Sequence, residues 1–173
     1  FEKQISLSVK ARNSVISKWP ISPLGSMAEI RKGSAITQKK STPGQFKVVA
    51  GGMDFAYTHN KSNRPAHTIT ISASGASAGF VNLWREPIFA SDCTTVRGID
   101  DLHTEFFFQV LKSRQSEVQA TSSGAAQPHV YPKDIEAIQV PKPDAVTLRT
   151  IVTECEAVDQ EVSTAQTSMA NAL

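Results

Sequence analysis

The most conspicuous chemical motif in the sequence is a serine flanked by glycines. Gly75-Ala76-Ser77-Ala78-Gly79 matches the G-x-S-x-G pattern of serine hydrolases. In those enzymes the serine lies on a sharp turn between a strand and a helix, and an acid and a histidine follow. Asp92 and His129 do follow in that order. The residues after Gly79 have strand character, however, so we predict a glycine-rich hairpin and keep a serine hydrolase using Ser77 as a remote alternative.

The remaining polar residues suggest no other reaction. The histidines and cysteines show no spacing typical of metal ligands, and the chain has neither a phosphate-binding loop nor a dinucleotide fingerprint. Acidic residues at 100, 101 and 105 gather at a helix start, where carboxylates favour the helix dipole. We therefore expect no catalytic residue, no metal site and no cofactor bound by this chain.

Basic and amide side chains are concentrated between residues 31 and 65. This stretch holds seven basic residues and one acidic residue, although the whole chain has a net charge of only +2. Lys and Arg neutralise phosphates, while Asn, Gln and Arg carry the paired groups that read base edges in the major groove of DNA. Solvated loops that bind nothing are the alternative. The predicted DNA-binding residues are Gln38, Lys39, Lys40, Lys47, Tyr57, Asn60, Lys61, Asn63 and Arg64, with Ser74, Ser77 and Arg97 as additional candidates.

These candidates must be positioned by a domain of short strands and long loops. Alternating or apolar runs predict strands at 46–49, 68–72, 80–84, 88–90, 93–96 and 138–140, and Asp100 caps a predicted helix that carries Phe106 and Phe107. Residues 34–45 and 53–65 are predicted to be polar loops. The expected fold class is α+β: a small globular domain of short twisted strands with one or two helices.

A long helix is predicted at 144–173, with Asp144 as its N-cap. Small or apolar residues recur there at alternating steps of three and four, which is the pattern of a coiled coil, and the helix would be about 45 Å long at about 1.5 Å per residue. We expect this seam to face another long helix, so that residues 144–173 form a spacer arm; a surface helix packed on its own domain is the alternative. The predicted helix-pairing seam is Leu148, Ile151, Cys155, Val158, Val162, Ala165 and Met169.

Composition and length complete the division into parts. We predict a connecting helix at 1–18 that ends before Trp19-Pro20, a recognition domain at 19–143 and the arm at 144–173. An apolar content of 40% suffices for a core, and no apolar run reaches the roughly 18 residues of a membrane span. Two distant cysteines fit a reducing compartment, so we expect a cytoplasmic protein.

Taken together in this order, the motifs resemble a known family. The chain resembles one target recognition domain, with its attached conserved helix, of the specificity (S) subunit of a type I restriction–modification enzyme. The likeness covers roughly residues 19–159. It is carried by Trp19, PLGSMAEI at 23–30 with KG at 32–33, TITIS at 68–72, Gly75, GFV at 79–81, GAAQP at 124–128, IQVPKP at 138–143 and the helix opening at 148–158.

The resemblance implies a non-catalytic role in a larger complex. Such subunits use two recognition domains to read a split double-stranded DNA sequence, and an antiparallel pair of long helices holds the domains apart. The helices dock methyltransferase (modification) subunits, which bind S-adenosylmethionine, and a separate restriction (motor) subunit cleaves DNA. Because this chain has one domain and one helix, we expect a half-subunit that forms a homodimer, a fragment of a full subunit, or the C-terminal specificity domain of a single-chain restriction–methylation enzyme. A coiled-coil protein that ignores nucleic acid is a further alternative.

Overall fold

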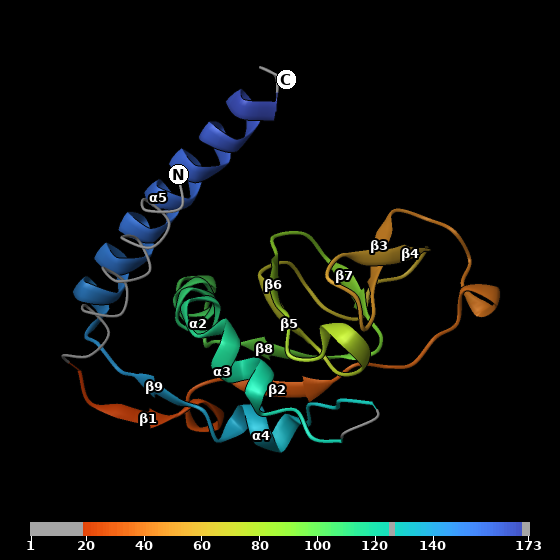
Figure 1. Ribbon diagram of the computed structural model, residues 1–173, viewed down its shortest axis with the longest axis horizontal. Helices are drawn as coiled ribbons and strands as arrows, with labels where there is room; N and C mark the ends of the chain where they lie inside the picture. Colours follow the sequence, from red (N-terminus) through yellow and green to blue (C-terminus); the bar gives the residue numbers. More distant parts are fainter. Residues whose placement is uncertain (1–18, 125–126, 171–173) are drawn as a thin grey trace.

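The computed structural model describes residues 19–124 and 127–170, apart from the side chains of Gln166 and Met169 (Figure 1). Two small sheets, three helices and a short strand pair form a domain, and a long helix, α5, extends from one end of it. The predicted α+β fold class is confirmed. The connecting helix predicted at 1–18 lies outside the described residues.

The larger sheet, called here the core sheet, is built around a central strand that is buried along its whole length. β5 (Thr68–Ser72) has the alternating β-branched sequence TITIS and pairs with a neighbour on each side. All pairings in this sheet are antiparallel, in the order β2-β8-β5-β6. The other members are β2 (Glu29–Lys32), β6 (Val81–Trp84) and β8 (Cys93–Arg97).

A short turn confirms the predicted hairpin between β5 and β6. The 3-10 helix η3 (Gly75–Ser77) connects the two strands, and Gly75 and Gly79 have φ angles of 79° and 81°. L-residues with side chains rarely adopt such angles, which explains the two glycines. Ser77 therefore lies on a turn between two strands and not at the strand-to-helix elbow that a hydrolase requires.

The smaller sheet, called here the outer sheet, has the order β4-β3-β7. β3 (Phe46–Val49) pairs antiparallel with β4 (Phe55–His59) and parallel with β7 (Ile88–Ala90). β4 corrects the prediction of a continuous loop at 53–65. Its alternating Phe55, Tyr57 and His59 form a strand because they add an edge to β3, a gain that its polar surroundings conceal in the sequence.

One long helix covers the core sheet. α2 (Asp101–Ser113) begins at the predicted cap, where Asp100 Oδ1 accepts a hydrogen bond of 2.8 Å from His103 N. Its buried side chains, including Phe106 and Phe107, join those of the sheet in one apolar core, and each fully buried side chain contributes roughly 1.5–3 kcal/mol. Two shorter helices that the pattern did not predict complete this side: α3 (Gln115–Ala120) and α4 (Pro132–Glu136).

The chain enters and leaves the domain through one antiparallel strand pair. β1 (Ile21–Pro23) pairs with β9 (Gln139–Pro141), so the strand predicted at 138–140 is confirmed with a shift of one residue. Lys142 N also donates a hydrogen bond of 2.8 Å to Pro20 O. The segments on either side of the domain are therefore held next to each other.

α5 (Ala145–Ala170) starts at Asp144 as predicted, because Asp144 Oδ1 accepts from the amides of Val146 and Thr147 at 3.0 Å. Within the described residues, its first half packs on this domain: Leu148, Ile151 and Cys155 are buried in the domain core, together with Val152, and α5 packs against α2. This corrects the expectation for the first half of the seam, since α2 supplies its apolar partner.

Farther along α5 the seam leaves the domain. Val158 and Val162 are half-buried and Ala165 is exposed, while the side chain of Met169 is outside the description. The helix runs out from the domain in this part (Figure 1), so its second half is free of the domain core. In the part of the chain that the structure describes, no helix is long and apolar enough to cross a membrane.

Candidate nucleic-acid interface

The most exposed basic segment is the loop after β2, residues 34–42, called here the basic loop. A 3-10 helix, η2 (Gln38–Lys40), forms its apex, and all three of its side chains are exposed. At its first end, Ile36 N donates to Ser91 Oγ at 3.2 Å, and Ile36 O accepts a hydrogen bond of 2.7 Å from Tyr57 Oη. These contacts fix the loop to β4 and to the β7–β8 turn.

The second end of the basic loop is fixed to the same strand. Ser41 Oγ donates to Thr58 O at 2.8 Å, and Thr42 N donates to His59 Nδ1 at 3.2 Å. The His59 ring is buried and lies edge-on against Phe89, with ring centroids 5.2 Å apart. Because both ends are fixed, the apex is displayed on a defined frame and not on a free loop.

The segment that follows β4 lies against the base of this loop. A Cβ atom at Gly44 would be 2.5 Å from Asn60 Cα, so only glycine allows this approach. Asn60 and Lys61 are exposed, and within the described residues neither side chain has a hydrogen bond or ion pair. The same holds for the three apex side chains. We call this set the basic edge: Gln38, Lys39, Lys40, Asn60 and Lys61.

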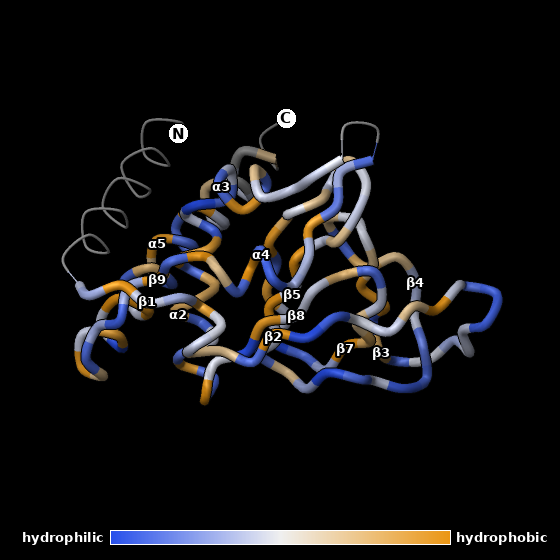
Figure 2. Tube along the Cα trace, turned by 90° about the horizontal axis from the view of Figure 1, so that it is seen from below, coloured by the Kyte–Doolittle hydropathy of each residue, from blue (hydrophilic) through white to orange (hydrophobic). Residues whose placement is uncertain are grey.

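The basic edge lies at the end of the molecule opposite α5. Figure 2 shows hydrophilic loops projecting beyond β3, β4 and β7, while α5, β1 and β9 lie at the other end. Free ammonium and amide groups at this end can bind phosphates and base edges. The sequence also placed Lys32 in the basic stretch without singling it out as a site residue; its exposed side chain at the start of the basic loop adds one more charge.

Arg64 does not have the geometry of a base-reading residue. Its Nε donates to Thr95 Oγ1 at 2.9 Å, Nη1 to Asn63 O at 2.8 Å and Nη2 to Lys32 O at 2.9 Å. Nε and Nη2 thus join the loop after β4 to β8 and β2, and Nη1 makes a contact within the loop. The predicted role is corrected to a structural one.

Asn63 is also occupied by the protein. Its Nδ2 donates to Ala90 O at 2.9 Å, and its Oδ1 accepts from Ala90 N at 2.7 Å. A side-chain amide would read adenine through the same donor–acceptor pair, but here the backbone of a buried strand residue takes that place. Asn63 is therefore not placed to read DNA.

Four other candidates have structural partners. Lys47 Nζ lies 2.6 Å from Glu86 Oε1, and the Tyr57 hydroxyl is the loop anchor described above. Arg97 Nε donates to His67 O at 3.2 Å, and Ser74 Oγ donates to Asp92 Oδ2. These contacts restrict how far the four can reach toward a ligand, although Lys47 remains partly exposed.

The remaining candidate, Ser77, is half-buried on η3. Among the described residues, no hydrogen bond joins it to Asp92 or His129, and the Asp92 carboxylate is bound by Ser74 instead. The structure therefore does not assemble the order of serine, acid and histidine that the sequence contains.

Other reactive groups are unfavourably placed for chemistry. Burial raises the pKa of the Cys93 thiol to about 12, so it is not a nucleophile at neutral pH. Across residues 19–124 and 127–170, no group of three or more His, Cys, Asp or Glu side chains could hold a metal ion.

The anchors of the basic loop, Ser41, Thr42, His59 and Ser91, were not predicted. Their only sequence signal is that two of them precede the turn residues Pro43 and Gly44. Ser41 and Thr42 find their partners on β4, at Thr58 O and His59 Nδ1, and β4 is a strand that was itself not predicted.

The protein belongs to the class of small α+β domains with a long helix that extends from one end. Comparison with known proteins then gives the family. The family model for the type I restriction modification DNA specificity domain matches residues 16–168, and the chain belongs to that family.

Two curated relatives agree with this assignment. A putative type I specificity subunit of Mycoplasma pneumoniae is 27% identical over 139 residues, which are 78% of this chain and 37% of that protein. A putative type I specificity subunit of Mycoplasma genitalium is 25% identical over 138 residues, which are 77% of this chain and 35% of that protein. The chain thus spans little more than a third of the length of these relatives.

Solved structures share the fold. The S subunit of a type I restriction–modification system from M. genitalium superposes with a TM-score of 0.75 at 21% identity, over 87% of this chain and 41% of that chain. The HsdS subunit of Thermoanaerobacter tengcongensis gives a TM-score of 0.73 at 18% identity, over 96% of this chain and 46% of that chain. A chain from a structural study of complex assembly and conformational transition of the type I R-M system gives a TM-score of 0.77 at 18% identity, over 99% of this chain and 48% of that chain.

Proposed function

We propose that this chain reads one part of a DNA target for a type I restriction–modification enzyme, and that the basic edge makes the contact. The observation that carries the proposal is the basic loop: both of its ends are bonded to β4 or its neighbours, and its apex presents Gln38, Lys39 and Lys40 to solvent. Base recognition needs exposed hydrogen-bonding side chains that are held in place by a rigid scaffold.

Within the basic edge the side chains differ in their proposed roles. Lys39, Lys40 and Lys61 neutralise phosphates and position the duplex, which contributes affinity without sequence preference. Gln38 and Asn60 carry amide groups with a donor and an acceptor, which can pair with an adenine edge. The chain itself performs no reaction in this proposal, and methylation and cleavage belong to partner subunits or domains.

We further propose the partners that the family implies. The outer half of α5, with Val158, Val162 and Ala165 on its seam, pairs with a second long helix, either from a second recognition domain or from another copy of the chain. Methyltransferase subunits that bind S-adenosylmethionine and a restriction subunit complete the complex. A single polypeptide that contains both activities, with this chain as its specificity domain, is the alternative arrangement. Cytoplasmic localisation follows from the presence of chromosomal DNA there.

A salt titration of DNA affinity tests the proposal. We expect the full chain to bind a random duplex weakly and with strong salt dependence, and the double variant Lys39→Ala/Lys40→Ala to reduce the slope of log K against log salt by roughly 2. The matched control is Lys133→Ala/Lys142→Ala, which removes two exposed lysines outside the basic edge. If both double variants have the same slope as the wild type, the DNA-binding surface is elsewhere.

A selection from random duplexes tests the proposed base contacts. Gln38→Ala or Asn60→Ala is expected to lose about 1–3 kcal/mol on the selected target and to relax the preference at one position. Both side chains are exposed, so the fold should not change. Uniform loss on all sequences would show that these amides contact only the DNA backbone.

A further inference from the structure

The contact between α5 and the domain changes in character along the helix. Up to Cys155 it is apolar, since Leu148, Ile151, Val152 and Cys155 belong to the core. Beyond Cys155, two acidic residues of α5 make polar contacts with the domain: Glu156 and Asp159, on neighbouring turns. We call the polar contacts that begin here the polar junction; its residues are Arg85, Glu105, Gln109, Glu156 and Asp159.

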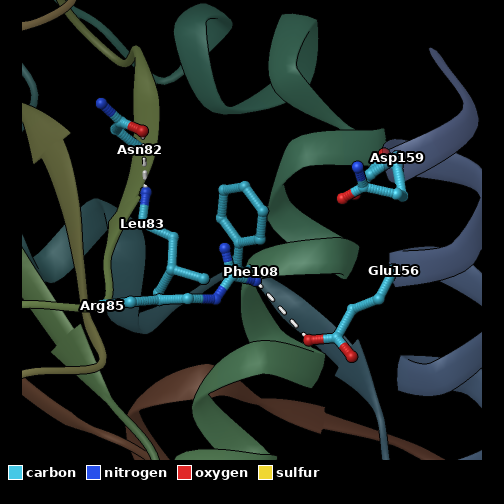
Figure 3. A pocket seen from close by; sticks show the side chains of 7 residues that line it. Asn82, Leu83, Arg85, Phe108, Glu156 and Asp159 are labelled. Carbon is cyan, nitrogen blue, oxygen red and sulfur yellow. Dashed lines mark hydrogen bonds and ion pairs between the residues drawn. The ribbon is translucent and has the colours of Figure 1, made fainter. Parts of the chain in front are cut away.

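Arg85 joins three elements at this junction. It follows β6, and its Nε and Nη2 donate to the two carboxylate oxygens of Glu105 on α2, at 2.9 and 2.7 Å. The Glu105 side chain is only 7% exposed. The same Nη2 lies 3.6 Å from Glu156 Oε1 on α5, as the dashed line in Figure 3 shows. A bidentate pair fixes the plane of the guanidinium, so Arg85 presents its Nη2 to α5 in one direction.

Glu105 is itself held from a second side. His67 Nδ1 lies 3.1 Å from Glu105 Oε1, and His67 adopts a left-handed φ of 52°, a conformation that few side-chain-bearing residues accept. Arg97 Nε donates to the carbonyl oxygen of His67. The carboxylate that orients Arg85 is therefore fixed by the segment just before β5, and not only by α2.

Gln109 makes a second contact about one turn farther along α2. Its side chain is 2% exposed, and its Nε2 donates to Asp159 Oδ2 at 3.1 Å. Lys112, half-buried with its Nζ donating to Val81 O at 3.1 Å, attracts the same carboxylate. The desolvation that comes with this position lowers the pKa of Lys112, and the charge of Asp159 opposes that effect.

A cavity of about 530 Å³ lies at this junction, between β6, α2 and α5. Leu83 of β6, Phe108 of α2 and Gln160 of α5 are among its lining residues, and Figure 3 shows Arg85 and Glu156 reaching toward each other there. Apolar packing is therefore incomplete beyond Cys155. Apolar contacts tolerate small rotations because they are non-directional, whereas ion pairs and hydrogen bonds depend on orientation.

From this geometry we propose that Arg85 and Gln109 are positioning residues that set the direction in which α5 leaves the domain. A change of direction at the junction is amplified along the half of the helix that lies beyond it. The two residues thereby select the separation between the basic edge and any second DNA-reading element that the arm holds. The claim about spacing rests on the proposed function, while the claim about direction does not.

The direction of α5 can be measured in the full chain by distances between two spin labels, on Ser116→Cys in α3 and Thr164→Cys in α5. Both sites are exposed, whereas Cys93 and Cys155 are buried and resist labelling. The test variant is Glu156→Ala/Asp159→Ala. The matched control is Glu154→Ala/Glu161→Ala, which removes the same charge from exposed positions of the same helix. We expect the distance distribution to shift and broaden in the test variant and to stay unchanged in the control.

Arg85→Lys extends the test because it keeps the charge but not the bidentate geometry. It is expected to give a distribution of intermediate width. If the test and control variants give the same distribution as the wild type, packing up to Cys155 alone sets the direction and the inference is overturned. Helix content measured by circular dichroism confirms that each variant has folded.

The consequence for DNA is measured with the assembled specificity complex and duplexes that carry two half-sites at varied spacing. We expect Glu156→Ala/Asp159→Ala to shift or relax the preferred spacing, at unchanged affinity for a single half-site. A variant that merely destabilised the domain would lower both. If the wild type binds no DNA, the proposed function fails while the spin-label result still decides the direction. If DNA binds and the spacing preference is identical in both double variants, the claim about spacing is overturned.

Discussion

The core sheet and the outer sheet are stabilised in different ways. The core sheet is covered by α2, on which α5 packs in turn, and its strands contribute to one continuous apolar cluster that includes Ile69, Ile71 and Phe106. A second, much smaller cluster joins the outer sheet to the core sheet: it contains Val49, Ile88 and Ala90 of the outer sheet with Trp84 of β6 and Cys93 of β8. Apolar burial alone therefore explains the first sheet but not the second.

Hydrogen bonds from side chains to backbone atoms supply the difference. Asn63 holds Ala90 of β7, Tyr57 holds Ile36, and Ser41 holds Thr58. The polar residues of the outer sheet and its loops therefore fall into two groups. One group holds the sheet and its loops together, and the other, the basic edge, is left exposed. Four predictions test this contrast.

The largest effect is expected in the core sheet. Phe106 is 1% exposed, and Phe106→Ala should lower the free energy of unfolding by about 3–5 kcal/mol in urea denaturation, because it leaves a cavity in the continuous cluster. Phe55→Ala is the matched change in the outer sheet. Its ring is 40% exposed and is 5.3 Å from Lys47 Nζ, so the expected loss is about 1 kcal/mol or less. Equal losses would mean that the outer sheet also depends on apolar burial.

Among the polar residues of the outer sheet and its loops, Asn63 should cause the largest loss of stability when it is replaced by alanine (Asn63→Ala). The change removes two hydrogen bonds and leaves the buried Ala90 amide without its acceptor, for a loss of about 2 kcal/mol in unfolding free energy. Asn60→Ala, three residues earlier on an exposed site, should change stability by less than about 0.5 kcal/mol. For DNA affinity, measured under conditions where both variants are fully folded, we expect the opposite order: Asn60→Ala weakens binding more than Asn63→Ala, because Asn60 contacts the base and Asn63 only supports the loop.

Tyr57→Phe removes a single hydroxyl. The lost hydrogen bond to Ile36 O should cost about 1 kcal/mol and loosen the first end of the basic loop. Hydrogen exchange of the Lys40 amide, which donates to Thr37 O, should become faster, while exchange in β5 stays the same. Unchanged exchange at Lys40 would show that the second end alone fixes the loop.

The smallest effect belongs to the core side, at the exposed cap of α2. Asp100→Ala should lower unfolding free energy by about 0.5–1 kcal/mol at neutral pH. Hydrogen bonds from the His103 amide, and then from its ring, lower the pKa of Asp100 below its ordinary value of 3.8. Stabilisation by the carboxylate is therefore present above pH 3.8 and is lost as the pH falls through the lower pKa of the folded state.

Asp100→Asn is the control for the pH dependence, because the amide can still cap the helix but does not titrate. The difference in unfolding free energy between Asp100→Asn and Asp100→Ala should therefore stay constant across the acid range, because neither variant titrates at this position. A difference between wild type and Asp100→Ala that persists unchanged well below pH 3 would contradict the assigned cause.

The elements that could be predicted from the sequence are those with a strong local pattern. β5 alternates β-branched residues, α2 has an N-cap followed by apolar residues at helical spacing, and α5 has a long uninterrupted repeat. β1, β2 and β4 were not predicted because they are short edge strands whose pairing partners are distant in sequence. Their stability comes from those partners, which a local pattern does not contain.

For the site, residue type identified the region but not the individual residues. Arg64 and Asn63 have the chemistry to read bases, yet Thr95, Lys32 and Ala90 use their hydrogen-bonding groups. The exposed Lys39 and Lys61 differ from them only in their surroundings. The same reasoning applies to α5, where one periodic seam serves the domain core up to Cys155 and leaves it afterwards.

The pairing of β1 with β9 has a consequence for how such a protein can be altered. Because Pro20 and Lys142 are hydrogen-bonded neighbours, the domain between them begins and ends at the same place in the structure. Another domain whose first and last strands form the same antiparallel pair could replace this domain without changing the path of the flanking segments. Under the proposed function, such an exchange would change the DNA sequence that is read and leave the flanking segments in place.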